Sequence, residues 1–144
     1  MKDIFGIQLY SVREEIKTKG FPEMLKTIKE AGYDCVEFAG FYDYTPQEVA
    51  KLLKANNLTG ISAHIGIDSI ELQLPYIDAI GIKYVYIPWC NYEDMCGEKF
   101  NELTEKIRRV KKLLDERGIV FGYHNHCLLY TSPSPQDPKT SRMP

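Results

Sequence analysis

The sequence predicts an α/β fold in which helices cover a parallel sheet, arranged as the N-terminal part of a (β/α)8 barrel with about five strands and four helices. Short, mostly apolar runs alternate with longer segments whose apolar residues recur every three or four positions. A residue suited to ending a helix precedes the later strands, at Gly32, Asn57, Gly81 and Gly118. Parallel strands need crossover connections, usually helices, so this alternation is typical of a parallel sheet.

The first strand–helix unit begins at the N-terminus. Residues 4–12 form an apolar strand candidate, and residues 21–31 have helical spacing that stops at Gly32. The predicted inner face of this helix consists of Phe21, Met24, Leu25 and Ile28. Residues 35–38 then form the second predicted strand.

The second helix carries a start signal. Thr45 has the position of an N-cap, Pro46 follows at the first helical position, and Glu48 completes a capping-box pattern. The predicted inner face consists of Val49, Leu52 and Leu53. Residues 59–65 form the third strand.

The third helix, at residues 69–80, has weaker periodicity and is expected to be interrupted near Pro75. It leads into a fourth strand at residues 84–88. The fourth helix is the clearest, with apolar residues at Phe100, Leu103, Ile107, Val110 and Leu114. Gly118 ends it, and residues 119–123 form the fifth strand.

Two folds fit this pattern: an open doubly wound sheet and a barrel. No GxGxxG or GxxxxGK[ST] pattern opens a helix, which removes support for the nucleotide-binding forms of the open sheet. A complete barrel typically takes about 250 residues. Residues 1–126 supply four units and a fifth strand, so we expect an incomplete barrel domain.

The last 18 residues have a different character, because Pro, Ser and Thr replace the apolar periodicity. Residues 127–137 resemble one reading frame of a transposase-type sequencing adapter, and residues 141–144 resemble its far end. We therefore expect residues 127–144 to be a non-native, disordered tail and the natural sequence to continue differently after His126.

The composition limits the kinds of partner that the chain is expected to bind. The chain has 44% apolar and 26% charged residues, a net charge of −2, and no run of more than two Lys or Arg, so we do not expect it to bind nucleic acid. It has no apolar stretch of about 18 residues and no signal-peptide pattern, so no membrane span is predicted. Four cysteines without CxxC spacing favour a reducing, cytoplasmic location.

In a barrel, function lies at the carboxyl ends of the strands. The candidate residues at these positions are Gln8, Tyr10, Glu37, His64, Trp89, His124, Asn125 and His126. Strand alternation aims His124 and His126 at the same side, which suits a divalent metal or an anionic sugar oxygen. Either could instead simply bond a loop. His64 reads equally well as a loop residue, Glu37 could be a surface carboxylate paired with a lysine, and Tyr10 and Trp89 could be rim aromatics or stack on a sugar.

Five motifs in order resemble one family. They are Gly6–Arg13 (GIQLYSVR), Ala31–Tyr33 with Val36–Gly40, Ser62–His64, Gly81–Val85 and Gly122–His126. Together they resemble the sugar-phosphate isomerase/epimerase family of xylose-isomerase-like TIM barrels, in register over residues 4–126.

The resemblance implies proton transfer next to a sugar carbonyl, assisted in the full-length protein by Mn, Mg, Zn or Co. It implies that His124 or His126 is a metal ligand, with the choice open. Gln8, Tyr10, Glu37, His64, Trp89 and Asn125 are then expected to bind the sugar. In the family the catalytic carboxylates come from later strands, so we expect this polypeptide by itself to be inactive.

Three other functions stay open beside the isomerase or epimerase. One is a lyase that dehydrates an inosose-like keto-polyol, and another is a non-catalytic sugar-binding barrel. The third is a DNA repair enzyme like endonuclease IV, which the acidic strand-end loops disfavour because DNA phosphates require Lys and Arg. The sequence also leaves a homo-oligomer open.

Overall fold

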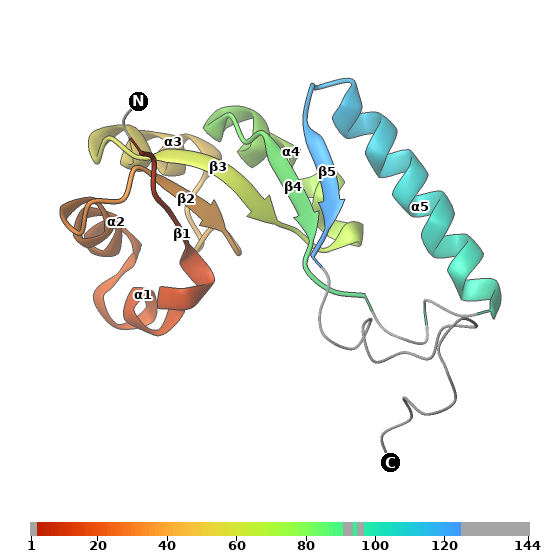
Figure 1. The fold of residues 1–144 in the computed structure, drawn as a ribbon, viewed down its shortest axis with the longest axis horizontal. Helices are drawn as coiled ribbons and strands as arrows, with labels where there is room; N and C mark the ends of the chain where they lie inside the picture. Colours follow the sequence, from red (N-terminus) through yellow and green to blue (C-terminus); the bar gives the residue numbers. More distant parts are fainter. Residues whose placement is uncertain (1–2, 91–93, 95–96, 125–144) are drawn as a thin grey trace, which may run out of the picture.

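The computed structural model describes residues 3–90, 94 and 97–124, and Figure 1 shows their fold. Its centre is one five-stranded sheet in which every neighbouring pair is parallel. The strands are β1 (Gly6–Gln8), β2 (Cys35–Phe38), β3 (Thr59–His64), β4 (Tyr84–Ile87) and β5 (Val120–Tyr123). Each strand lies beside its neighbour in sequence, which is the order of a barrel and not of a doubly wound sheet.

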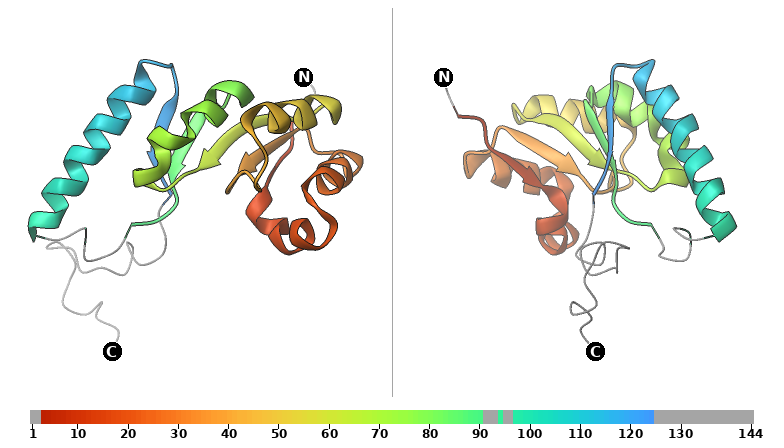
Figure 2. Two further views of the ribbon diagram at one scale, coloured as in Figure 1. Left: turned by 180° about the vertical axis from the view of Figure 1, so that it is seen from behind. Right: turned by 45° about the vertical axis from the view of Figure 1, so that its right-hand side comes forward.

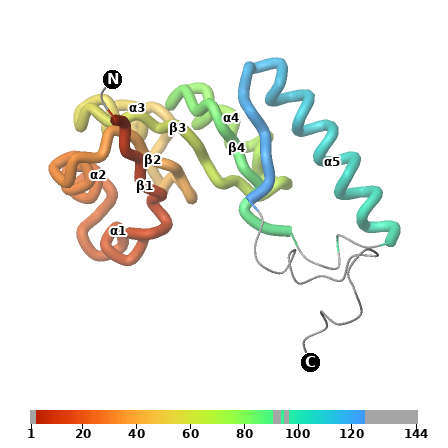
Figure 3. Tube along the Cα trace, in the orientation of Figure 1, coloured from red at the N-terminus to blue at the C-terminus, as the bar shows by residue number. Residues whose placement is uncertain are grey.

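The described connections between the strands include five α-helices and two short 3-10 helices. They are η1 (Leu9–Val12), α1 (Arg13–Lys19), α2 (Phe21–Glu30), α3 (Pro46–Ala55), η2 (Ile67–Ser69), α4 (Ile70–Ile80) and α5 (Gly97–Asp115). Seen from behind, α3 and α4 lie in front of the sheet (Figure 2). The tube in Figure 3 follows the strands as they fan out in order from β1 to β5. No helix of the described part is long and apolar enough to cross a membrane.

The hydrophobic core lies between the helices and one face of the sheet, which we call the covered face. Strand residues Val36, Phe38 and Val85 are fully buried there. The helix residues that pack into the same core include Phe21, Leu25, Ile28, Val49, Ile77, Val110 and Leu114. These positions follow the apolar spacing of the sequence, because only one stripe of each helix faces the sheet.

The opposite face of the sheet, here called the open face, has a different composition. Register pairs Gln8 with Glu37 and Glu37 with Ser62, so these polar residues share this side. Tyr84 and Val120 occupy the same face farther along the sheet and are 38% and 55% exposed. The open face therefore carries polar side chains and is partly accessible to solvent.

The N-terminal unit differs from the sequence prediction. The strand predicted over residues 4–12 ends at Gln8, and the chain turns through η1 into α1, which the apolar spacing did not predict. Only Ile16 of α1 is buried, so the helix has almost no apolar period to detect. Its charge order is favourable, with Glu14 in the first turn and Lys19 in the last, as the helix dipole prefers.

The other element predictions are confirmed with one exception. Strand β2 has the predicted bounds, and the capping box forms at α3. The backbone N–H and hydroxyl of Thr45 donate to the Glu48 carboxylate, which lowers the pKa of that carboxyl. The predicted interruption at Pro75 is wrong: α4 continues through it, with Ile70 and Ile77 buried on either side of the proline and holding both halves.

Candidate functional site

Three neighbouring strands bring polar side chains to their carboxyl ends. Gln8 ends β1, Glu37 is the third residue of β2, and Ser62 and His64 belong to the last half of β3. Parallel strands end at the same edge of the sheet, so the four side chains meet at one rim. We call Gln8, Glu37, Ser62 and His64 the Glu37 cluster.

The carboxylate of Glu37 is the centre of this cluster. Gln8 Nε2 donates to Glu37 Oε1 at 2.7 Å, and the Ser62 hydroxyl donates to Oε2 at 2.6 Å. The Glu37 side chain is 23% exposed and the His64 side chain 11%, so the cluster is largely shielded but reachable. Two hydrogen bonds to a shielded carboxylate fix its orientation.

His64 contacts both the Glu37 carboxylate and its partner Gln8. Its Nδ1 lies 3.4 Å from Gln8 Nε2, and its Nε2 lies 3.4 Å from Glu37 Oε1. An amide nitrogen can only donate, so Nδ1 is best suited as the acceptor, and the proton then resides on Nε2 facing the carboxylate. The arrangement orients an imidazole and a carboxylate toward the same space at the rim.

His124 extends the cluster toward β5. Its backbone N–H donates to the carbonyl of Ile87 at 3.0 Å, which holds it at the end of the β4–β5 pair. Its ring centroid lies 4.8 Å from that of His64, with the planes 72° apart. Tyr86 meets His64 edge-on at 5.9 Å, and a Cβ at Gly122 would stand only 2.9 Å from the Tyr86 ring. Gly122 therefore makes room for Tyr86 beside His64.

The structure places some of the predicted site residues together and others apart. It brings together Gln8, Glu37, His64 and His124. Tyr10 lies apart in η1, 55% exposed, with the Arg13 guanidinium 4.3 Å from its ring. Trp89 is 57% exposed and lines a different cavity. The roles of all these residues stay predictions.

Two predicted site residues fall outside the described part of the chain, and one residue of the Glu37 cluster was not predicted. Asn125, His126 and the predicted tail at residues 127–144 lie outside the described residues. Ser62 was not predicted, although it stands two positions before His64 in the same strand and alternation aims both at one face.

The described residues do not complete a metal site. Among them, no group of three or more His, Cys, Asp or Glu side chains is arranged to hold a metal ion. Both oxygens of Glu37 already accept hydrogen bonds from Gln8 and Ser62. His64 and His124 have the right donor atoms for a borderline divalent metal, but a catalytic site needs about three protein ligands. We therefore derive no chemical step from a metal.

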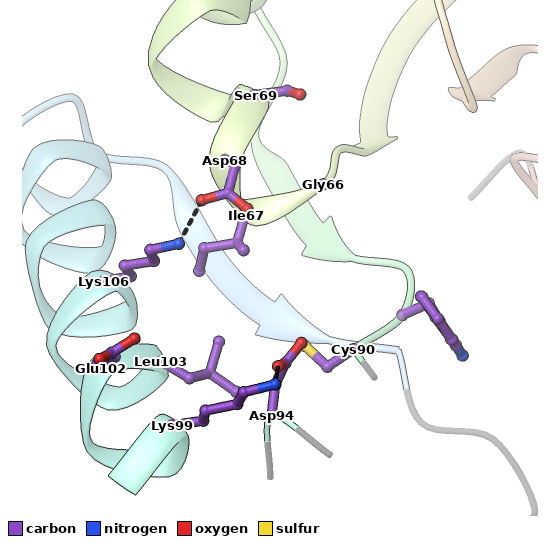
Figure 4. Close-up of a pocket in the computed structure, with 11 residues that line it drawn as sticks. Gly66, Ile67, Asp68, Ser69, Cys90, Asp94, Lys99, Glu102, Leu103 and Lys106 are labelled. Atoms are coloured by element: carbon purple, nitrogen blue, oxygen red, sulfur yellow. Dashed lines mark hydrogen bonds and ion pairs between the residues drawn. The ribbon is translucent and has the colours of Figure 1, made fainter. Parts of the chain in front are cut away.

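Near the rim, described residues line two cavities of about 400 Å³ each. The first lies between η2, the segment after β4 and α5, and it is shown in Figure 4. Lys106 in it pairs with Asp68 at 2.7 Å, and Lys99 lies 3.8 Å from Asp94. Burial and the charge of Asp94 raise the pKa of the Cys90 thiol there, which makes it a weak nucleophile. The second cavity has His64 on its wall.

Comparison with known proteins supports the fold. No family model matches the chain, and no curated protein matches it in sequence. A sugar phosphate isomerase/epimerase from Parabacteroides distasonis superimposes with a TM-score of 0.72 at 18% identity, over 87% of this chain and 55% of that protein. An AP endonuclease, family 2, from Brucella melitensis gives 0.65 at 22% identity, over 85% and 55%.

A fusion protein of a xylose isomerase-like TIM barrel and a 4-hydroxyphenylpyruvate dioxygenase gives a TM-score of 0.64 at 20% identity, over 82% of this chain and 21% of that one. The chain spans about half the length of the isomerase/epimerase and of the endonuclease. These likenesses show the fold, and the sequence prediction is confirmed at that level: the chain has the α/β fold of part of a xylose isomerase-like TIM barrel.

Proposed function

We propose that this chain supplies the sugar-binding part of the active site of a metal-dependent isomerase or epimerase, which moves a proton next to a sugar carbonyl. The observation that carries the proposal is the Glu37 cluster, in which a hydrogen-bonded carboxylate and an imidazole converge at the carboxyl ends of barrel strands. Only the family resemblance supports the metal in this proposal.

In this proposal each side chain of the cluster has a task. Gln8 and Ser62 hold the Glu37 carboxylate in place, leaving its remaining lone pairs to accept hydrogen bonds from sugar hydroxyls. The His64 imidazole, with its proton on Nε2, is held against Glu37, and the His124 imidazole, whose ring centroid lies 4.8 Å from that of His64, can donate to a carbonyl or alkoxide oxygen. Such positioning stabilises the negative charge that develops on the sugar oxygen when the neighbouring carbon loses its proton.

The likeness to an AP endonuclease raises DNA cleavage as a second candidate. Binding a DNA backbone requires cations at the site. The Glu37 cluster contains no Lys or Arg, and neither do the described residues that line the adjoining cavity. This charge pattern favours a sugar over a DNA phosphate.

The test begins with binding to the whole chain. Ligand-observed NMR with D-fructose, D-tagatose and D-psicose should detect weak binding, and Glu37→Gln should weaken it about tenfold or more, because a carboxylate makes stronger hydrogen bonds than an amide. Glu14→Gln, at the exposed start of α1, is the matched control and should bind like the unmodified chain. Equal binding by Glu37→Gln and the unmodified chain would refute the assignment of the cluster.

The second step separates the reactions. The chain alone and a longer protein with the later barrel strands restored are incubated with each ketose in D2O. We expect deuterium exchange next to the carbonyl and epimer formation only in the longer protein. A dehydrated product from a keto-inositol would instead establish a lyase, and binding without exchange would establish a non-catalytic sugar-binding barrel.

A further inference from the structure

The second cavity adjoins the Glu37 cluster. Its lining includes an unsatisfied acceptor and a carboxylate that have no role in the proposed function. It lies between the loop after β2 and the segment from the end of β3 into α4, and we call it the loop cleft. Its lining consists of Ala39, Gly40, Phe41, Tyr42, Asp43, His64, Ile65, Gly66, Ser69, Gln73 and Tyr76. His64 belongs to both, so the loop cleft begins beside the Glu37 cluster.

Gln73, from α4, gives the loop cleft an unsatisfied acceptor. Its Oε1 is buried and accepts no hydrogen bond from the described part of the chain. Buried acceptors without a donor are uncommon in folded proteins because desolvation is then uncompensated. Since the described residues offer no donor, a bound hydroxyl group or a water molecule can supply one.

The charge of the loop cleft is negative. Asp43 is the one carboxylate among its described lining residues, and no Lys or Arg accompanies it. Asp43 occupies the left-handed region with φ 62°, in the loop that follows β2. A carboxylate accepts hydrogen bonds from sugar hydroxyls but repels a phosphate dianion. In the first cavity, Lys106 and Lys99 are each paired with an aspartate and do not supply a free cation.

The walls of the loop cleft are held in place by aromatic packing. Phe41 and Tyr76 stack with ring centroids 4.2 Å apart, and the Tyr76 hydroxyl donates to the carbonyl of Tyr44 at 2.8 Å. Tyr42 stacks on Phe21 at 4.8 Å, and burial raises the pKa of its phenol to about 12, so it stays neutral. The loop cleft is thus preformed, which reduces the entropic cost of binding.

We propose that the loop cleft binds the uncharged, hydroxyl-bearing end of the sugar whose carbonyl end lies at the Glu37 cluster. Gln73 Oε1 and the Asp43 carboxylate accept hydrogen bonds from its hydroxyl groups. This inference rests on the proposed function and names its substrate class: a free polyhydroxy ketose and not its phosphate ester.

The first experiment tests Gln73 in the whole chain. Gln73→Met keeps the shape of the side chain but removes the acceptor, and we expect it to weaken binding of the free ketoses about 2- to 10-fold. Gln47→Met, on the exposed side of α3, is the matched control. Gln73→Glu retains an acceptor and should bind free ketoses within about 2-fold of the unmodified chain, so a loss confined to Gln73→Met is not a folding effect.

The second experiment tests charge with matched ligands, D-fructose and D-fructose 6-phosphate. The unmodified chain should prefer the free sugar, and Asp43→Asn should reduce that preference several-fold while keeping a residue that tolerates the left-handed backbone. Tighter binding of the phosphate by the unmodified chain would overturn the inference. So would ketose binding by Gln73→Met equal to that of the unmodified chain, which would mean that Gln73 Oε1 is merely hydrated.

The outcomes also separate this inference from the proposed function. If Gln73→Met weakens binding and Glu37→Gln does not, the loop cleft binds sugar but the catalytic assignment fails. If Glu37→Gln weakens binding and Gln73→Met does not, the cluster stands and the loop cleft is refuted. If no ketose binds to the folded chain, both are refuted.

Discussion

The two faces of the sheet show how one strand can serve stability and function at once. On the covered face, Val36, Phe38 and Val85 are fully buried among helix side chains. On the open face, Ser62 is 6% exposed and Val120 55%. Strand β2 alternates between the two, because Val36, Glu37 and Phe38 point in turn to the core, the rim cluster and the core. Changes on the covered face should therefore cost stability, and changes at the Glu37 cluster or directly beside it on the open face should cost binding.

The largest expected effect is on the covered face, at Phe38. Its ring is fully buried and lies 6.4 Å from Phe21 and 5.2 Å from Phe41, centroid to centroid. Phe38→Ala removes this packing and leaves a cavity, so the free energy of unfolding should fall by about 3–5 kcal/mol. Chemical denaturation followed by circular dichroism measures it. Leu72→Ala, at a side chain 79% exposed on α4, should change stability by less than about 0.5 kcal/mol. Equal effects of both substitutions would contradict the division into two faces.

The covered face was also the part that the sequence predicted best. A buried stripe leaves a periodic apolar signal, so β2 and the inner faces of α2 and α3 were placed correctly. Helix α1 was missed because it buries little more than Ile16. A single buried residue gives no periodic pattern of apolar residues that the sequence could reveal.

The candidate site was predictable in part. The predicted bounds of a strand also fix its carboxyl end. Gln8, Glu37 and His64 could therefore be placed at one rim from the sequence. Gln73 could not, because it lies inside a helix and its missing partner depends on how α4 packs beside the β2 loop. Tyr10 was predicted at the rim but lies in η1, because the chain leaves the strand at Gln8.

A smaller loss of stability is expected at Gly60, a glycine of β3 on the covered side. A Cβ there would lie 2.4 Å from Ile80 Cγ2 and 2.9 Å from the Phe38 ring. Gly60→Ala overpacks this region, and we expect a loss of about 1–3 kcal/mol in the free energy of unfolding. Gly66→Ala is the matched control, because a Cβ at Gly66 would meet nothing within 4 Å. A neutral Gly60→Ala would show that α4 shifts freely relative to the sheet.

The smallest effect on stability is expected at Gly122, the corresponding glycine of the open face. A Cβ there would lie 2.9 Å from Tyr86 Cδ1, which is as tight as the contact of Gly60 with Phe38. The Tyr86 ring is only half-buried, so it can turn toward solvent, and Gly122→Ala should change the free energy of unfolding by less than about 0.5 kcal/mol. The displaced ring is the one that meets His64 edge-on, so the effect should appear at the site instead.

Two measurements test this difference. The NMR signals of the His64 ring should shift in Gly122→Ala as the ring current of Tyr86 moves away, and ketose binding should weaken by a few-fold because His64 loses a neighbour that limits its orientation. Val120→Ala, on the same strand and face, is the control and should leave both unchanged. A loss of stability at Gly122 as large as that at Gly60 would mean that the open face is packed as tightly as the covered one. The site would then be part of the core, because a ring that cannot turn away from an added methyl group has no solvent space beside it.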